Sequence, residues 1–288
     1  MKADQARRDN VYSAVAQTGN RVFARLSRYL DRVSKHADMQ SIHRFRTNSR
    51  RVEALVAELV PESANQRKLL KQLSKLRKKA GKVRDLDVQQ AFLKELKMPD
   101  RQNHRAELIE QLREEHELRV RKIRHSFDSG SLKKLGKRLR RAKAEVKFAG
   151  IDPLDLALKR LPKPQGAALN EQQLHAWRIA AKRARYLAEL AGDSSEAKEF
   201  IAQLKTVQDE IGQWHDVLKL EQRAEERFGG VHNSALVAAL QNIRGARFRR
   251  ATNALFAALS AMEHLRQRAP AAKAAKSEGV AAQATAVA

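Results

Sequence analysis

This sequence of 288 residues contains no cysteine, which excludes structural disulfides, thiolate metal sites and a cysteine nucleophile. Proline (6) and glycine (12) are also scarce, so few points exist where a helix must end. Aromatic residues make up only 5% of the chain. A surface that stacks single-stranded nucleic acid needs aromatics among its basic residues, so sequence-specific RNA recognition is not predicted. No run of about 18 apolar residues occurs, and we therefore expect no membrane-spanning segment.

Basic residues, in contrast, are abundant. Lys and Arg together number 58 against 33 Asp and Glu, which gives a formal net charge of +25. Such an excess destabilises the compact state by self-repulsion and concentrates anions around the protein. Nucleic acid, an anionic membrane and polyphosphate are therefore candidate partners. The first residues, Met1 to Arg8, lack the apolar stretch of a secretory signal, and we expect a cytoplasmic protein that does not act at a membrane.

Helix-forming residues dominate, and no segment alternates apolar and polar residues over a sustained length. The sequence therefore predicts an all-α fold, with helices over roughly residues 10–37, 40–60, 63–80, 84–97, 101–127, 131–148, 153–161, 170–191, 194–211, 214–228 and 232–267. The stretch 162–168 holds two prolines and a glycine and is the predicted linker between two halves. Residues 270–288 have no apolar periodicity, and we expect a disordered Ala/Lys tail there.

Two motifs occur twice at almost the same offset. The first copy of a basic motif reads His43-Arg-Phe-Arg46-Thr-Asn-Ser-Arg50-Arg51, and the second, 132 residues later (175 − 43), reads His175-Ala-Trp-Arg178-Ile-Ala-Ala-Lys182-Arg183. Likewise, Gly81-Lys-Val-Arg84-Asp85 recurs 131 residues later (212 − 81) as Gly212-Gln-Trp-His215-Asp216. We interpret the chain as two copies of one helical unit, residues 1–161 and 169–269, related by a predicted pseudo-two-fold axis.

With both motifs present twice and in the same order, the sequence resembles the CHAD family, the conserved histidine α-helical domain, over about residues 10–267. The resemblance implies two four-helix bundles with additional helices around a basic central groove. It also implies that inorganic polyphosphate binds in this groove. One departure is Glu53, which lies where the first repeat of the family usually places an arginine.

The basic motif has a physical interpretation of its own. On a helix over 40–60, the apolar residues form one stripe, while His43, Arg46 and Arg50 fall at i, i+3 and i+7 on a second face. The second copy contributes the row His175, Arg178, Lys182 and Arg185. Like charges one turn apart repel by a few tenths of a kcal/mol, and arginine donates two hydrogen bonds to a phosphate at once. These rows favour a polyanion partner, with a solvated helix face as the alternative for each.

The histidines and aspartates of the motifs allow two interpretations each. His43 and His175 are either ligand contacts or packed side chains, and in an empty basic groove we expect the pKa of each to be depressed. Asp85 and Asp216 either cap helices that begin nearby or pair with an arginine. No acid stands at metal-ligand spacing from the two histidines, so neither a metal nor a cofactor is predicted. No phosphate loop or nucleophile motif is present, and we predict no enzymatic activity.

The predicted function is therefore non-catalytic binding of inorganic polyphosphate in a groove where the two copies meet, with association to polyphosphate granules. Non-specific DNA binding of the nucleoid type and an adaptor role on granule surfaces remain the alternatives. A further basic run, Lys133 to Lys143, is either a solvated face or an extension of the polyanion surface. The predicted polyphosphate-binding residues are His43, Arg46, Arg50, Arg51, Lys78, Arg84, His175, Arg178, Lys182, Arg183, Arg185, Lys205 and His215.

Overall fold

The computed structural model describes residues 2–36, 38–162, 169–192 and 194–285, and in these ranges the chain is helical without a strand. The predicted all-α fold is confirmed. The elements in chain order are α1 (Lys2–Lys35), α2 (Met39–Leu59), α3 (Ala64–Glu95), α4 (His104–Arg124), η1 (His125–Phe127), α5 (Ser129–Glu145), α6 (Pro153–Lys159), α7 (Glu171–Ala188), η2 (Glu189–Ala191), α8 (Ser195–Phe228) and α9 (Ala235–Thr285). Almost all of the predicted linker, residues 163–168, lies outside the described residues.

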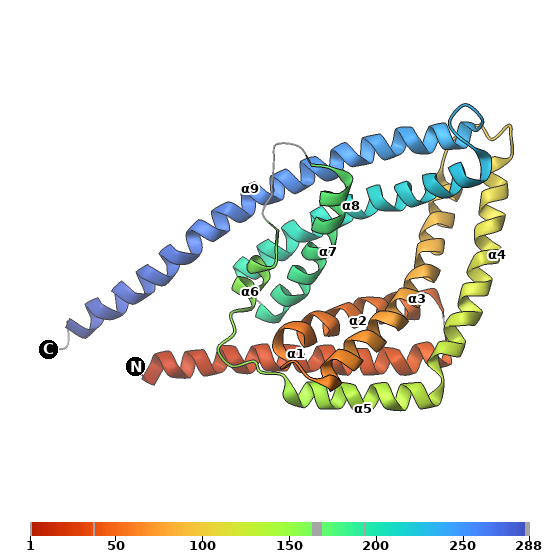
Figure 1. Cartoon of the computed structure of the whole chain (residues 1–288). Helices are drawn as coiled ribbons and strands as arrows, with labels where there is room; N and C mark the ends of the chain where they lie inside the picture. Colours follow the sequence, from red (N-terminus) through yellow and green to blue (C-terminus); the bar gives the residue numbers. More distant parts are fainter. Residues whose placement is uncertain (1, 37, 163–168, 193, 286–288) are drawn as a thin grey trace.

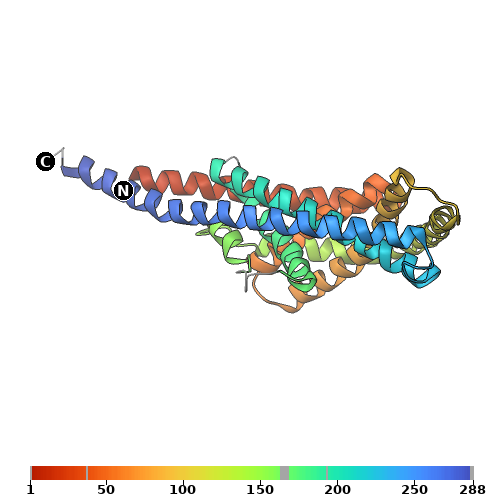
Figure 2. The same ribbon diagram turned by 90° about the horizontal axis from the view of Figure 1, so that it is seen from above.

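The helices are arranged in an elongated molecule (Figures 1 and 2). Helix α1 lies between α2 and α5, and α3 and α4 run side by side toward the end where α8 turns back into α9 (Figure 1). Helices α8 and α9 form an antiparallel pair. The start of α1 and the end of α9 lie at the same end of the molecule in both views. Within the described part of the chain, no helix is long and apolar enough to cross a membrane.

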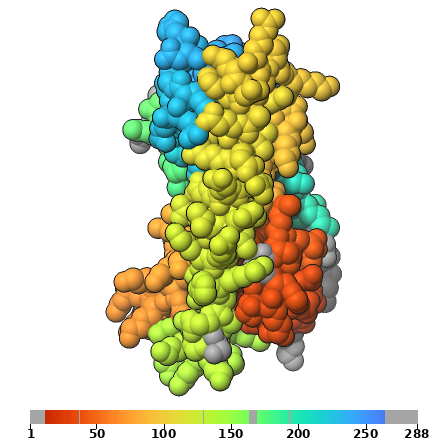
Figure 3. Space-filling model, turned by 90° about the vertical axis from the view of Figure 1, so that its right-hand side faces the viewer, coloured from red at the N-terminus to blue at the C-terminus, as the bar shows by residue number. Residues whose placement is uncertain are grey.

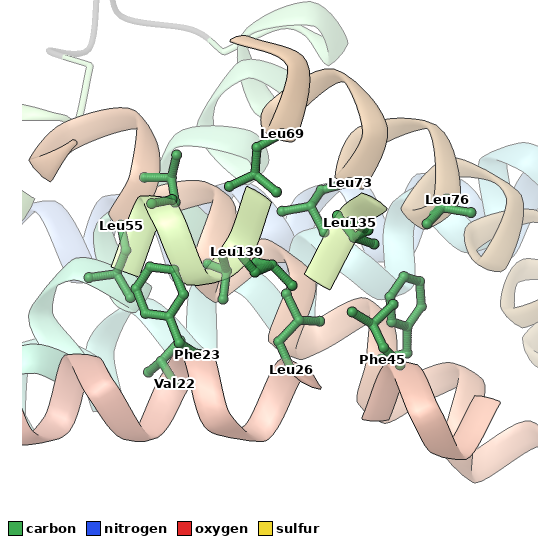
Figure 4. Packing of buried hydrophobic residues seen from close by; sticks show 14 of the residues in the cluster. Val22, Phe23, Leu26, Phe45, Leu55, Leu69, Leu73, Leu76, Leu135 and Leu139 are labelled. Atoms are coloured by element: carbon green, nitrogen blue, oxygen red, sulfur yellow. The ribbon is translucent and has the colours of Figure 1, made fainter. Parts of the chain in front are cut away.

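Apolar side chains of the first half form one core. Leu26 of α1, Phe45 of α2 and Leu73 of α3 are fully buried in it together with Leu135 of α5 (Figure 4). These residues recur at helical spacing in the sequence, and each helix buries the stripe that they form. The packing of α1, α2, α3 and α5 around this core fixes the direction in which the basic row of α2 points.

The second half has its own core, and a third core belongs to both halves. Leu174 of α7, Phe200 of α8 and Leu255 of α9 are buried in the second. The third lies at the far end of the molecule, where Leu86 of α3 and Val217 of α8 belong to the same buried cluster. The two copies of the repeated unit are therefore not separate bodies, because α3 and α8 share apolar contacts.

The predicted helix breaks between residues 80 and 84 and between residues 211 and 214, at Gly81 and Gly212, were wrong. Both lie inside long helices, α3 and α8, that continue without a break. A glycine inside a helix costs about 1 kcal/mol relative to alanine. Ala80 and Val83 around Gly81 are fully buried, and the packing of such neighbours outweighs this cost. The capping prediction for Asp85 and Asp216 fails with it, since neither residue stands at a helix start.

The carboxyl-terminal segment also differs from the expectation. Helix α9 continues through Pro270 to Thr285, whereas a disordered tail was predicted over 270–288. The segment lacks an apolar face, but it is rich in alanine, which has the highest helix propensity of all residues. Residues 286–288 lie outside the described residues.

Candidate functional site

The two helices that carry the basic motif, α2 and α7, pack against each other. Each begins at a side-chain cap: Asp38 accepts a hydrogen bond from the backbone N–H of Ser41, and Asn170 forms a capping box with Gln173. Helices α3 and α8, which carry the second motif, are also in contact. The two copies of each motif therefore meet at the junction of the two halves.

Four cations gather at this junction, and we call them the central basic cluster: Arg46 and Arg50 of α2 with Arg178 and Lys182 of α7. Electrostatic effects connect them directly. The pKa of Arg46 falls to about 10, mainly because burial disfavours its charge and further because Arg50 and Arg178 repel it. Only 13% of the Arg46 side chain is exposed. The cluster thus holds positive charges in a place that solvates them poorly.

Lys182 experiences this environment most strongly. Burial, followed by repulsion from Arg178, Arg50 and Arg46, lowers its pKa from the ordinary 10.5 to about 6. The Lys182 amine is therefore mostly uncharged at neutral pH when no anion is present. An anion placed beside the amine would restore its proton, because opposite charges favour the charged form.

Two carboxylates accompany the four cations. Asp85 of α3 accepts from Nη1 of Arg46 at 3.5 Å, which confirms the alternative in which this aspartate pairs with an arginine. Asp216 of α8 raises the pKa of Arg178 electrostatically, against the lowering by burial. The Nε of Arg178 is buried and makes no hydrogen bond within the described ranges. The cluster therefore retains excess positive charge and a donor that lacks an acceptor.

Histidines of both repeats lie beside the cluster. The pKa of His43 is lowered by burial and then by Arg84, Arg46 and other arginines. The rings of His175 and His215 stack with centroids 5.4 Å apart, and the pKa of His175 is lowered by burial and then by His215. The predicted depression of the pKa is confirmed for His43 and His175. Both shifts favour the neutral ring, and an anion bound beside either histidine would favour its protonated form again.

Three predicted site residues form ion pairs with carboxylates of the protein. Nε of Arg51 donates to Glu189 at 2.6 Å, and Arg185 lies 3.8 Å from the same carboxylate. Arg183 pairs with Glu58, whose side chain is only 3% exposed. Arg51 and Arg183 are the second members of the basic pairs, and adjacent residues point about 100° apart on a helix. The first members, Arg50 and Lys182, therefore reach the central basic cluster while the second members hold α2 and α7 in place.

Three further predicted residues, Arg84, Lys78 and Lys205, are not members of the cluster. Arg84 of α3 is close enough to His43 to lower the pKa of that ring. Lys78 is exposed on α3 and acts electrostatically on Glu53, which binds Nε of Arg77 at 2.8 Å. Lys205 is exposed on α8, and none of the contacts between described residues joins it to the cluster.

Lys219 is a neighbour that the sequence reasoning missed. It lies one turn after His215 on α8 and lowers the pKa of His175, so it adds a cation on the α7–α8 side. Its i+4 spacing from His215 was the available signal. Over the described residues, no group of three or more His, Asp or Glu side chains could hold a metal ion.

Comparisons with known proteins agree with this architecture. The family model of the CHAD domain matches residues 19–225. A search of the curated proteins found no match. The chain is similar to the crystal structure of the CHAD domain from the plant Ricinus communis, with 19% identity, a TM-score of 0.62, and coverage of 87% of this chain and 92% of that chain. It is also similar to PptA from Streptomyces chartreusis, with 14% identity, a TM-score of 0.58, and coverage of 88% and 99%.

Proposed function

The chain belongs to the CHAD domain family, and from this premise we propose that it binds inorganic polyphosphate at the central basic cluster without catalysing a reaction. The observation that supports this most directly is the convergence of Arg46, Arg50, Arg178 and Lys182 from two repeats. Burial disfavours the charges of Arg46 and Arg178, and cations that are poorly solvated and incompletely paired are costly. A bound chain of phosphates would offset this cost by supplying a negative charge at every unit.

A thin and flexible polyanion suits the cluster better than duplex DNA does. Most of the Arg46 side chain is covered by protein, and a stiff duplex cannot fold around a covered guanidinium to bring several phosphates close to it. Single-stranded nucleic acid would require exposed aromatic rings on which bases stack. The aromatic residues nearest in sequence to the motifs, Phe45, Trp177 and Trp214, are buried in the cores. Arginine and lysine with a few histidines are sufficient for bare phosphates.

The proposal is tested by removing two cluster arginines, one from each repeat. Arg46→Gln with Arg178→Gln removes two charges without placing a new carboxylate beside Asp85. Each charge-assisted hydrogen bond is worth about 1.5–3 kcal/mol, so we expect the affinity for long-chain polyphosphate to fall about 100-fold or more. Isothermal titration calorimetry measures the affinity, and circular dichroism verifies that the helices persist.

A matched control separates the site from net charge. Arg249→Gln with Arg250→Gln removes the same charge from α9, where both side chains are exposed, and should change the affinity less than about threefold. If the cluster variant is folded and binds as well as the control does, polyphosphate does not bind at this cluster. Competition between polyphosphate and duplex DNA at moderate salt tests the DNA-binding alternative. A nucleoid-type protein would release polyphosphate and bind the duplex.

Association with polyphosphate granules would follow from the same binding. A fluorescent fusion of the full chain should gather on granules in cells that make polyphosphate, and the Arg46→Gln, Arg178→Gln variant should be diffuse. An adaptor that attaches through a different surface would keep the variant on the granules. The two outcomes therefore distinguish binding through the cluster from the adaptor alternative.

A further inference from the structure

A cavity of about 290 Å³ lies between the start of α3 and helix α5, well away from the central basic cluster. Five cations line it, and no carboxylate does: Lys68, Lys134, Lys137, Arg138 and Arg141. None of the five forms an ion pair with a carboxylate within the described part of the chain. Figure 3 shows the orange surface of α3 beside the yellow-green surface of α5 on one side of the molecule. The basic run noted at 133–143 in the sequence contributes most of this lining.

The cavity is built on a rigid framework. Leu69 and Leu73 of α3 pack with Leu135 and Leu139 of α5 in the first core (Figure 4). On the cavity side, Nη1 of Arg138 donates to the side-chain oxygen of Gln72 at 2.6 Å, so a neutral group positions the guanidinium and leaves its charge uncompensated. The side-chain nitrogen of Asn65, also in the lining, is buried and makes no hydrogen bond among the described residues. The site thus offers both charge and a free donor to an anion.

A row of lysines connects this cavity to the central basic cluster. They recur every three or four residues along α3, and all are exposed: Lys68, Lys71, Lys75, Lys78 and Lys82. This spacing keeps them on one face of the helix. Lys68 lines the cavity, and Asp85 at the cluster lies 17 residues further (85 − 68), which is about 26 Å along the helix axis. No acid interrupts the row, although like charges one turn apart repel.

We propose that the α3–α5 cavity is a second phosphate-binding site and that a single long polyphosphate chain occupies it and the central basic cluster together. The chain follows the lysine row of α3 between the two sites. This inference rests on the proposed function, and it adds a dependence on chain length. Tripolyphosphate, with three phosphates, can fill one site only, whereas a long chain gains the contacts of both sites through one binding event.

The experiment compares tripolyphosphate with long-chain polyphosphate on the full chain. Lys137→Gln with Arg141→Gln removes two exposed cations from the cavity and touches neither the core nor the cluster. We expect the affinity for the long chain to fall about tenfold, and its dependence on the logarithm of salt concentration to lessen by about one to two units, since two phosphate contacts are lost. The affinity of the cluster for tripolyphosphate should remain unchanged. The control is again Arg249→Gln with Arg250→Gln.

The outcomes separate this inference from the proposed function. If the wild-type chain binds long-chain polyphosphate and the cavity variant binds it equally well, the second site is refuted while the central site stands. The same conclusion follows if the control loses as much affinity as the cavity variant. If the cavity variant loses affinity for duplex DNA but not for polyphosphate, the cavity contacts nucleic acid and the inference is wrong. If the wild-type chain binds neither tripolyphosphate nor long-chain polyphosphate, both proposals are refuted.

Discussion

Replacing Lys182 by methionine should make the folded protein more stable. The folded-state pKa of Lys182 is about 6, against an ordinary value of 10.5. At pH 7 the unfolded chain therefore carries this charge and the folded chain does not. Each pKa unit corresponds to about 1.4 kcal/mol, so giving up the proton at pH 7 costs at most about 5 kcal/mol. Methionine keeps the unbranched shape and bears no charge.

The measured gain should be smaller than this upper limit, about 1–3 kcal/mol, because side chains and water relax around a partly covered amine. Urea unfolding monitored by circular dichroism gives the free energy of unfolding. Lys205→Met on the same helix as His215 is the matched control: Lys205 is exposed, and its replacement should change the free energy by less than about 0.5 kcal/mol.

The pH dependence provides the refutation. The folded-state pKa of Lys182 lies below the unfolded one, so the unfolded chain binds more protons between the two values. The loss of folding stability caused by Lys182 is therefore full below about pH 6 and disappears as the pH rises toward 10.5. The stabilisation by Lys182→Met should therefore be larger at pH 6 than at pH 9.5. A variant that is less stable than the wild type, or a gain that is equal at both pH values, would show that the Lys182 amine is not held in a repulsive environment.

Two further predictions concern binding. Polyphosphate should raise the pKa of Lys182 from about 6. The wild-type chain should therefore take up protons on binding at pH 7.5, and its affinity should fall as the pH rises through the pKa of the complex. Calorimetry in buffers of different ionisation enthalpy measures this proton uptake, which should be smaller in Lys182→Met; an unchanged uptake in the variant would disprove the assignment to Lys182. Truncation after Pro270 removes two lysines and one glutamate. The affinity for polyphosphate should therefore change less than about threefold, and the melting temperature should stay the same. A large loss of affinity would mean that α9 beyond Pro270 contributes to the site.

The contribution of ion pairs inside the protein could not be inferred from local patterns. Glu53 departs from the family pattern in the sequence, and the structure explains how the protein accommodates it: its carboxylate binds Arg77, one of the cations of α3. Glu58 and Glu189, which bind Arg183 and Arg51, carry no motif and gave no signal. Both ion pairs become visible only when α2, α7 and η2 are placed together, because each carboxylate and its partner lie on different helices.

The sequence by itself determined the all-α class, the buried stripes of α2 and α7 and the repetition of two motifs, since these depend on residue spacing along a single helix. It also determined that Arg46 and Arg178 lie beside a buried face. Only the tertiary structure decided that Arg50 and Lys182 face the cluster while Arg51 and Arg183 bind carboxylates, and that α3 and α8 continue through Gly81 and Gly212. Those features depend on which helix lies opposite, and the spacing within one helix carries no information about its neighbour.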